Sequence, residues 1–280
     1  MSMACNDGQA GMMRSIPFES QVYTKQADIQ LSYDVVKAQE AVGRDPKNVG
    51  AWDALGREYI RHHLYREAIA AYSTGLTFDP LCASLYMRRG QAYLNIMRYA
   101  ESVADSEMAI RLNPLAYDGW YHLIVANYLL GEDERCVQVF HDGKDYVEVI
   151  NDVICSVYWV WMALMRLGRK EEAAALDAEI SPGLKLIRNN AFYLVILMRK
   201  GLIKPEELLK TKDENPRANP FIIMRYGIAN YYWHTGRIEE YRDILAEIIK
   251  SAEEERWPCF GYQAALLESR RLTANEGNSI

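Results

Sequence analysis

The chain has 280 residues, of which 50% are hydrophobic, so it can bury at least one sizeable core and is not a disordered chain. Its 32 basic and 38 acidic residues give a net charge of -6 without a cluster of Lys and Arg, so neither nucleic acid nor an anionic membrane surface is an expected partner. No stretch approaches the ~18 consecutive apolar residues of a membrane-spanning helix, so no membrane insertion is expected.

The N-terminal segment, residues 1–16, is polar or small and is predicted to be disordered. It lacks the basic stretch and apolar run of a signal peptide. The 5 cysteines are scattered and form no CxxC pair, so we expect a cytoplasmic protein without disulfides or zinc. Met3-Ala4-Cys5 leaves one alternative, an envelope lipoprotein whose signal peptide was removed before Cys5.

The middle of the chain carries a repeat. Pro46, Pro80 and Pro114 are 34 residues apart, and each follows an Asp or Asn. Between the first two prolines stand, in order, Trp52, Leu55, Gly56, Tyr59, Ala68 and Tyr72. The spacing predicts a helical hairpin in which small residues allow close approach and Pro ends the second helix.

This order of residues resembles the tetratricopeptide repeat (TPR) family nearly position for position. The next unit repeats the pattern with Tyr86, Gly90, Tyr93 and Ala109. It departs from the family at Arg89, Ser102 and Ser106, where Leu, Ala and an aromatic residue are preferred, so looser packing is expected there. Later units keep the rhythm through glycines at Gly131, Gly168, Gly201 and Gly236.

The resemblance implies an all-α fold, a right-handed TPR-type solenoid of antiparallel helix pairs with about six units and a terminal capping helix. The solenoid is expected over residues 17–272, with a disordered tail at 273–280. Full repeats are expected at about 49–82, 83–116, 117–152, 153–186, 187–221 and 222–256. Several prolines disturb the fifth unit, which we expect to be irregular.

The C-terminal half carries three further motifs: Tyr158-Trp159-x-Trp161, Met224-Arg225-Tyr226-Gly227 and Tyr262-Gln263-Ala264-Ala265. Together they weakly resemble bacterial envelope TPR lipoproteins that act as adaptors for hydrolases and proteases. This resemblance implies a scaffold without chemistry of its own and raises the alternative of a homodimer.

In TPR proteins the first helix of each unit lines a concave groove. Transferring the groove positions to this chain selects Asp53, Arg57, Met87, Gln91, Tyr121, Tyr128, Tyr158, Met162, Met165, Tyr226, Asn230 and Trp233. Aromatic and Met side chains suit a peptide or helix of a partner protein. The carboxylate clamp of chaperone-binding TPR domains is not expected, because Asp53 and Tyr121 replace its Lys and Asn.

Two other interpretations of the aromatic side chains stay open. They could pack in the core or between protomers, since an aromatic stripe at helical spacing also builds cores. Alternatively, the chain is a helical-repeat enzyme or small-molecule binder with a pocket near His122 and Tyr158.

Chemistry-bearing residues form no recognised motif. We therefore expect no catalytic residues, no metal site and no cofactor. His122 and Cys136 are a conceivable imidazole and thiol pair across one hairpin, but we interpret Cys136 as a buried inert cysteine. His62 and His63 fall in a predicted turn, where we expect exposure and no function.

Overall fold

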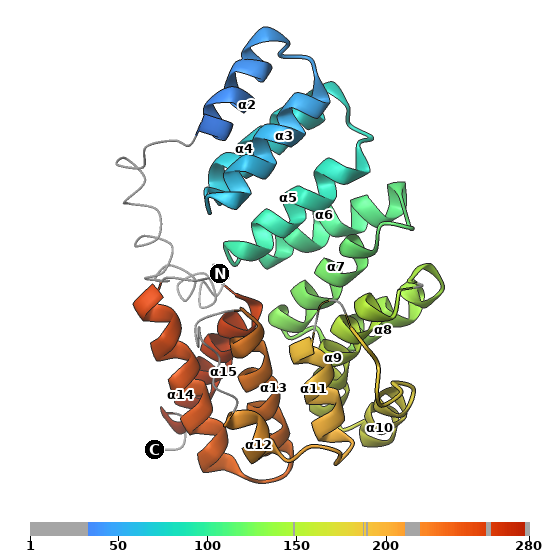
Figure 1. Cartoon of the computed structure of the whole chain (residues 1–280), viewed down its shortest axis with the longest axis vertical. Coiled ribbons are helices and arrows are strands. Elements are labelled where there is room, and N and C mark those ends of the chain that lie inside the picture. Colours follow the sequence, from blue (N-terminus) through green and yellow to red (C-terminus); the bar gives the residue numbers. More distant parts are fainter. Residues whose placement is uncertain are drawn as a thin grey trace, which may run out of the picture.

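The computed structural model describes residues 33–277 except positions 148, 187 and 189 and the segments 211–218 and 256–258. The predicted disordered segment 1–16 lies outside these residues. All regular structure within them is helical (Figure 1), which confirms the all-α prediction. No helix among them is both long enough and apolar enough to span a membrane.

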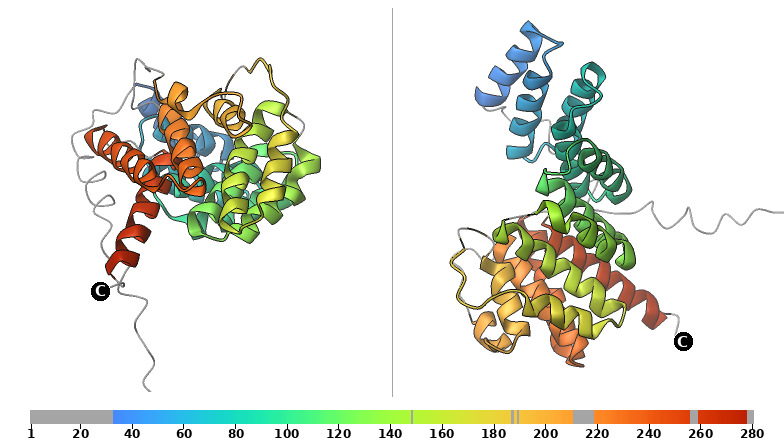
Figure 2. Two further views of the ribbon diagram at one scale, coloured as in Figure 1. Left: turned by 90° about the horizontal axis from the view of Figure 1, so that it is seen from below. Right: turned by 90° about the vertical axis from the view of Figure 1, so that its right-hand side faces the viewer.

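The helices follow one another in pairs. The first helices of the pairs are α3 (Val49–Arg61), α5 (Ala83–Asn95), α7 (Tyr117–Leu130), α9 (Ile150–Arg166), α11 (Asn190–Arg199) and α13 (Asn219–His234). The second helices are α4 (Tyr65–Phe78), α6 (Tyr99–Leu112), α8 (Asp133–Gly143), α10 (Lys170–Ala178), α12 (Pro205–Leu209) and α14 (Ile238–Glu255). Helix α2 (Tyr33–Arg44) precedes them, α15 (Phe260–Gly277) follows them, and the 3-10 helix η2 (Lys144–Tyr146) lies between α8 and α9. We call α2–α6 the N-terminal repeats and α7–α15 the C-terminal body (Figure 2).

The turns before two of the pairs are held by the same hydrogen bond. The indole Nε1 of Trp52 donates to the carbonyl of Pro46 at 2.8 Å, and Trp120 donates to Pro114 at the same distance. Each tryptophan therefore anchors the proline turn that precedes its own helix. The aromatic residue and the proline of the repeat pattern act as one unit.

The turn inside each pair needs a left-handed backbone, which L-residues with a Cβ adopt at a cost. Four of these turns use glycine, at Gly131, Gly168, Gly201 and Gly236. The first two pairs instead place His63 (φ 59°) and Met97 (φ 62°) there. The N-terminal repeats thus carry strain that the C-terminal body avoids.

Close helix approach in the first full pair depends on Gly56. A Cβ at this position would lie 2.2 Å from the ring of Tyr72, which is itself fully buried. Ala68, on the facing helix, is also fully buried. The structure therefore agrees with the packing expected from the repeat pattern.

The pair α5 and α6 has a polar interior. Arg89 donates two hydrogen bonds to the carboxylate of Asp105, at 2.7 and 2.8 Å. Ser102 and Ser106 are completely buried, and their hydroxyls have no hydrogen-bond partner among the described residues. These are the residues that depart from the repeat pattern, and their polar packing replaces the apolar packing expected of a regular unit.

The C-terminal body has one continuous hydrophobic core, whereas the N-terminal repeats have two small separate clusters. Helix α15 closes this body by returning to the end of α5. The buried carboxamide of Gln263 donates to the carbonyls of Leu94 and Asn95 at 3.2 and 3.5 Å and accepts from the hydroxyl of Tyr99 at 3.1 Å. Residues far apart in the sequence therefore meet at one polar seam.

One boundary differs from the expectation. Helix α15 extends to Gly277, beyond the predicted start of a disordered tail at residue 273. The fifth pair is irregular, as predicted, because α12 has only 5 residues and begins at Pro205. Proline suits the first turn of a helix, where its missing N–H would have no partner in any case.

Candidate functional site

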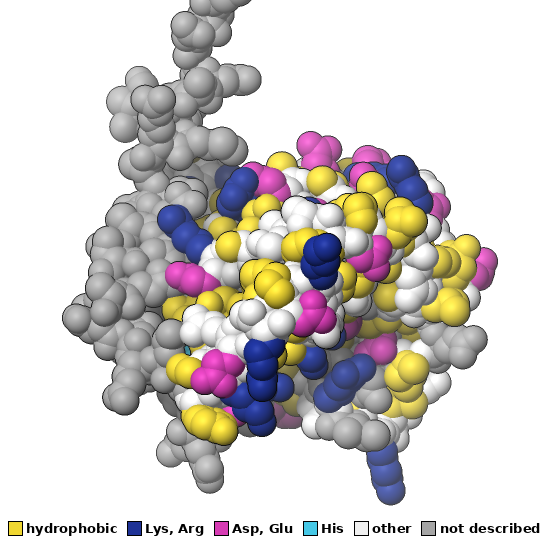
Figure 3. Space-filling model, turned by 90° about the horizontal axis from the view of Figure 1, so that it is seen from above, with side chains coloured by type: hydrophobic (Ala, Val, Ile, Leu, Met, Phe, Trp, Pro, Cys, Tyr) yellow, Lys and Arg dark blue, Asp and Glu magenta, His cyan; other side chains and the backbone are white. Residues whose placement is uncertain are grey.

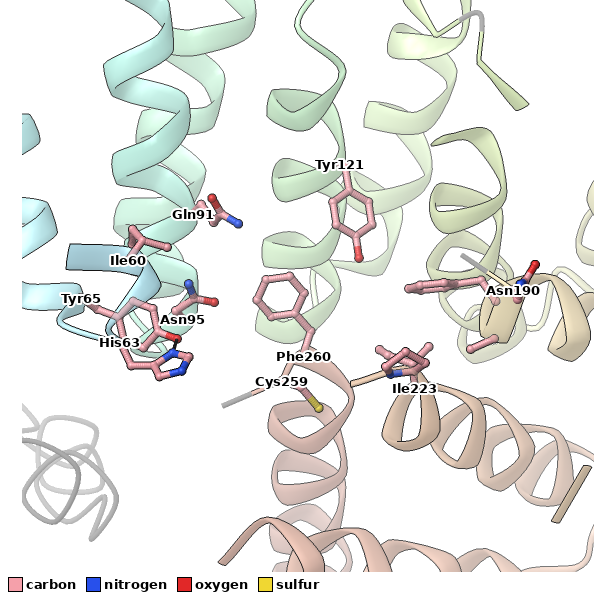
Figure 4. Close-up of a pocket in the computed structure, with 13 residues that line it drawn as sticks. Ile60, His63, Tyr65, Gln91, Asn95, Tyr121, Asn190, Ile223, Cys259 and Phe260 are labelled. Carbon is pink, nitrogen blue, oxygen red and sulfur yellow. Dashed lines mark hydrogen bonds between the residues drawn. The ribbon is translucent and has the colours of Figure 1, made fainter. Parts of the chain in front are cut away.

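A cavity of about 620 Å³ opens between the N-terminal repeats and the C-terminal body. We call it the central cavity (Figure 4). Its lining residues are Ile60, His63, Tyr65, Gln91, Asn95, Tyr121, Asn190, Ala191, Phe192, Pro220, Ile223, Cys259 and Phe260. Segments from both halves of the chain are therefore needed to form it.

One wall comes from the N-terminal repeats. Gln91 and Asn95 lie one helical turn apart on α5, so their carboxamides share one face. Figure 4 shows both side chains on the side of the cavity that α5 forms. Below them lie His63, in the turn between α3 and α4, and Tyr65, at the start of α4. His63 Nδ1 lies 3.0 Å from the hydroxyl of Tyr65. His63 is exposed, as expected, and it also borders the central cavity.

The opposite wall is aromatic and apolar. Tyr121 from α7 stacks on Tyr117 with ring centroids 6.0 Å apart, and its hydroxyl accepts a hydrogen bond from Trp159 at 3.3 Å. Phe260, at the start of α15, points into the same space (Figure 4). The contacts with Tyr117 and Trp159 fix the orientation of the Tyr121 ring.

The described lining of the central cavity contains no Lys, Arg, Asp or Glu. Burial, and then the neighbouring His62, lower the pKa of His63, so its imidazole is neutral at pH 7. Burial raises the pKa of Tyr121 and raises the pKa of Cys259 to about 12, so phenol and thiol both stay protonated. The described wall is therefore polar but uncharged.

Five of the residues expected in the groove are buried, and none of them lines the central cavity. They are Tyr128, Tyr158, Met162, Tyr226 and Asn230. The hydroxyls of Tyr128 and Tyr226 lie 2.6 Å apart, and Tyr158 donates to the carbonyl of Ile223 at 2.6 Å. The physical reason is that α13 and α15 cover the inner side of α7 and α9, so the aromatic stripe became core.

The other expected groove residues are at least partly accessible, but they lie apart. Gln91 and Tyr121 line the central cavity. On α3, the Asp53 carboxylate pairs with Arg57 at 3.2 Å and with Arg88 of the next pair at 2.9 Å. Met87 and Met165 are half-buried, and Trp233 is exposed. Gln91 and Tyr121 are therefore the two expected groove residues that line the central cavity.

Neither residue of the alternative pocket, His122 or Tyr158, lines the central cavity, although Tyr158 contacts Phe192 and Ile223, which do. His122 is buried, and desolvation lowers its pKa to about 4. Cys136 is fully buried, and desolvation raises its pKa. No hydrogen bond joins them in the part of the chain that the structure describes, so the geometry does not support an activated thiol.

The central cavity also contains residues that sequence reasoning missed. Asn95 could have been found, because it stands one helical turn after Gln91 on the same face. Asn190, Phe192 and Phe260 carried no such signal, because only the folding of α11 and α15 back towards α5 brings them there.

Neither a charged patch on the face shown in Figure 3 nor a cluster of metal-ligating side chains among the described residues indicates another kind of binding site. On the face shown in Figure 3, basic and acidic side chains are interspersed with hydrophobic ones and form no extended patch of one charge. Within the described residues, no group of three or more His, Cys, Asp or Glu side chains is placed to hold a metal ion.

Comparison with known proteins identifies the repeat. Residues 54–107 match the tetratricopeptide repeat family model. It is 26% identical to the Hsp70-Hsp90 organizing protein of Triticum aestivum over 102 residues, which are 36% of this chain and 18% of that protein. It is 29% identical to tetratricopeptide repeat protein 33 of Mus musculus over 85 residues, 30% of this chain and 32% of the relative.

The match therefore spans less than a third of each of these relatives. Among solved structures, a chain of the APC/C hetero-tetramer Cut9-Hcn1 superposes with a TM-score of 0.53 at 11% identity, covering 88% of this chain and 45% of that one. At this identity the likeness concerns the fold alone. None of these relatives is a bacterial envelope lipoprotein, so that resemblance stays a prediction.

Proposed function

We propose that this chain is a non-catalytic adaptor that binds a segment of another protein in the central cavity. The observation that carries the proposal is the cavity itself, which two distant parts of the chain form together. TPR proteins mediate protein–protein interactions, and the wheat relative is by its name an organizing protein for two chaperones. We extend to this chain only the general adaptor role.

The lining suits a peptide segment. The volume of the central cavity, about 620 Å³, falls in the usual range for ligand sites, roughly 300 to 1,000 Å³. Aromatic side chains such as Tyr121 and Phe260 bury large areas at small entropic cost, and carboxamides both donate and accept hydrogen bonds. A charged segment would lose hydration without a counter-ion in the described wall, so an uncharged stretch is favoured.

A catalytic role has little support in this cavity. A nucleophile or general acid-base needs a pKa near the working pH or a neighbouring base. The pKa of Cys259 is raised by burial to about 12, which leaves the thiol unreactive at pH 7. The side chains of the cavity therefore serve recognition.

The test uses a phage-displayed library of random peptides selected on the purified full chain. Gln91→Trp places a large ring in the central cavity. Arg57→Trp is the matched control, because Arg57 holds the same position one repeat earlier but does not line the cavity. We expect selected peptides to bind Gln91→Trp at least ~10-fold more weakly than the wild type, and Arg57→Trp within about 2-fold. Peptides that bind all three proteins alike would overturn the proposal.

Two further parts of this proposal concern assembly and location. The described cysteines, Cys82, Cys136, Cys155 and Cys259, are free thiols, which suits the reducing cytoplasm. Fractionation of the native cells checks this location. Homodimer formation is a separate prediction, and light scattering of the purified protein measures it directly.

A further inference from the structure

A second cavity, of about 230 Å³, lies in the C-terminal body and differs from the first in its chemistry. We call it the C-terminal cleft. It is lined by Arg166, Asn230, Trp233, His234, Tyr241, Glu268, Arg271 and Leu272. The central cavity lies at the first turns of α13 and α15, whereas this cleft lies at the last turns of α13 and two to three turns further along α15. The two cavities are therefore separate, and the proposed function does not use the second.

A buried ion cluster forms one wall of the C-terminal cleft. The guanidinium of Arg166 pairs with Glu268 and, at 3.2 Å, with Asp133. It also stacks on the ring of Tyr128, with its central carbon 3.9 Å from the ring centroid. The hydroxyl of Tyr241 donates to Glu268 at 3.0 Å. Both charges of the Arg166–Glu268 pair are thus satisfied within the protein, and the cluster fixes the wall.

His234 presents a polar atom that this cluster does not satisfy. Its Nε2 is buried and has no hydrogen-bond partner among the described residues. The ring packs edge-on against Trp161, with centroids 5.9 Å apart at 83°. Desolvation, and then the charge of Arg166, lower the pKa of His234 to about 4, so the ring is neutral at pH 7. A buried polar atom without a partner is costly, and a hydrogen-bonding ligand in the cleft that reaches it would remove that cost.

Arg271 supplies a positive charge at the rim. Its side chain is exposed, and no carboxylate of the described residues pairs with it within 4 Å, although burial raises the pKa of the Asp133 carboxyl and the charge of Arg271 acts to lower it. The guanidinium lies against the turn between α7 and α8, where a Cβ on Gly131 would come within 2.9 Å of it. A guanidinium held in this way can bind a carboxylate through two parallel hydrogen bonds.

An aromatic surface completes the cleft. Trp233 is 41% exposed and packs on Tyr241, with ring centroids 5.0 Å apart. An exposed indole beside a cation can stack on a flat ligand. For scale, an engineered cavity of about 150 Å³ holds benzene, so this cleft has room for a substituted benzene ring.

We infer that the C-terminal cleft binds a hydroxylated aromatic carboxylate. The carboxylate lies at Arg271, the ring lies on Trp233, and the hydroxyl meets Nε2 of His234. A hydroxyl can donate or accept, so it suits either tautomer of the histidine. The same chemistry occurs in a free hydroxyaryl acid and in the C-terminal tyrosine of a peptide.

The test is titration calorimetry on the full chain. The probes are 4-hydroxybenzoate, its neutral amide 4-hydroxybenzamide, and a pentapeptide ending in tyrosine with a free or amidated C-terminus. At least one of the two acids should bind saturably, and its amide should bind ~10-fold or more weakly, because it lacks the charge that Arg271 recognises. Tighter binding of the free peptide would assign the cleft to protein C-termini, and tighter binding of 4-hydroxybenzoate would assign it to a small acid.

Three variants sharpen the result. Arg271→Gln should weaken binding of the acid about 10-fold, whereas the matched control Arg270→Gln, one residue away and outside the cleft, should stay within about 2-fold. His234→Phe keeps the edge-on packing against Trp161 and should weaken the hydroxylated acid without lowering the melting temperature. Gln91→Trp should leave this binding unchanged, which separates the inference from the proposed function. No saturable binding of either acid, or equal binding by the wild type and Arg271→Gln, would overturn the inference.

Discussion

The N-terminal repeats and the C-terminal body use the same helix pair but pack it differently. In the N-terminal repeats, each small apolar cluster involves neighbouring helices, and the pair α5 and α6 is polar inside. In the C-terminal body, one core extends from Trp120 to Ala265 and includes only Leu94 from the N-terminal repeats, and tyrosine hydroxyls and a buried ion cluster link distant helices. The repeat pattern is therefore clearest where packing is local, and it fades where helices far apart in the sequence share a core.

The largest effect is expected at two ion pairs between helices, one in each region. Asp177 and Arg199 are almost fully buried, with 6% and 2% of their side chains exposed, and two hydrogen bonds of 2.9 and 2.6 Å join them. Asp177→Ala should cost about 3 to 5 kcal/mol, because it leaves Arg199 buried and unpaired. Urea unfolding of the full chain measures this free energy.

The matched variant in the N-terminal repeats is Asp105→Ala. Its partner Arg89 is 19% exposed, so water can solvate the guanidinium once the carboxylate is gone. We expect a smaller loss of unfolding free energy than for Asp177→Ala. An equal or larger loss would show that the two regions do not differ in how they bury charge.

The next largest effect is expected at the seam between the regions. Gln263→Leu removes the partners of the carbonyl of Leu94 and the hydroxyl of Tyr99. The cost should be about 1 to 3 kcal/mol, because both groups lie inside the protein. Differential scanning calorimetry should then show the N-terminal repeats unfolding in a separate, earlier transition. A single transition with an unchanged midpoint would mean that Gln263 does not couple the regions.

The smallest effect is expected in the turns within pairs. Gly168 has φ 75° and nothing within 4 Å of a Cβ built on it, so Gly168→Ala tests backbone strain alone and should cost about 1 kcal/mol. Met97→Gly should change stability in the opposite direction by about the same amount or less, since Met97 already pays that strain. Thermal melting of the two variants compares them, and shifts of the same sign would contradict a common turn conformation.

The sequence predicted local features better than distant ones. The spacing of Pro46, Pro80 and Pro114 with Trp52 and Gly56 was sufficient for the helix pairs, because each pair satisfies its contacts within about one repeat length. The polar residue Arg89, which departs from the repeat pattern, was also recognisable in the sequence. These features depend on residues close together in the chain.

The candidate site was only partly predictable for the opposite reason. Periodicity places Tyr128 and Tyr226 on the inner side of their helices, but it cannot tell an open wall from one covered by another helix. The positions of α13 and α15 decide this, and Gln263 links α15 to α5 across most of the chain. The same contact brings Phe260 to the central cavity, which no local pattern shows.

The most direct test of the adaptor account is hydrogen–deuterium exchange of the full chain with and without a library-selected peptide. The account predicts slower exchange in the last turn of α5, the turn around His63 and the start of α15, because these segments surround the central cavity. Protection confined to the C-terminal cleft or to helices that do not line the central cavity, with unchanged exchange in α5, would contradict this account.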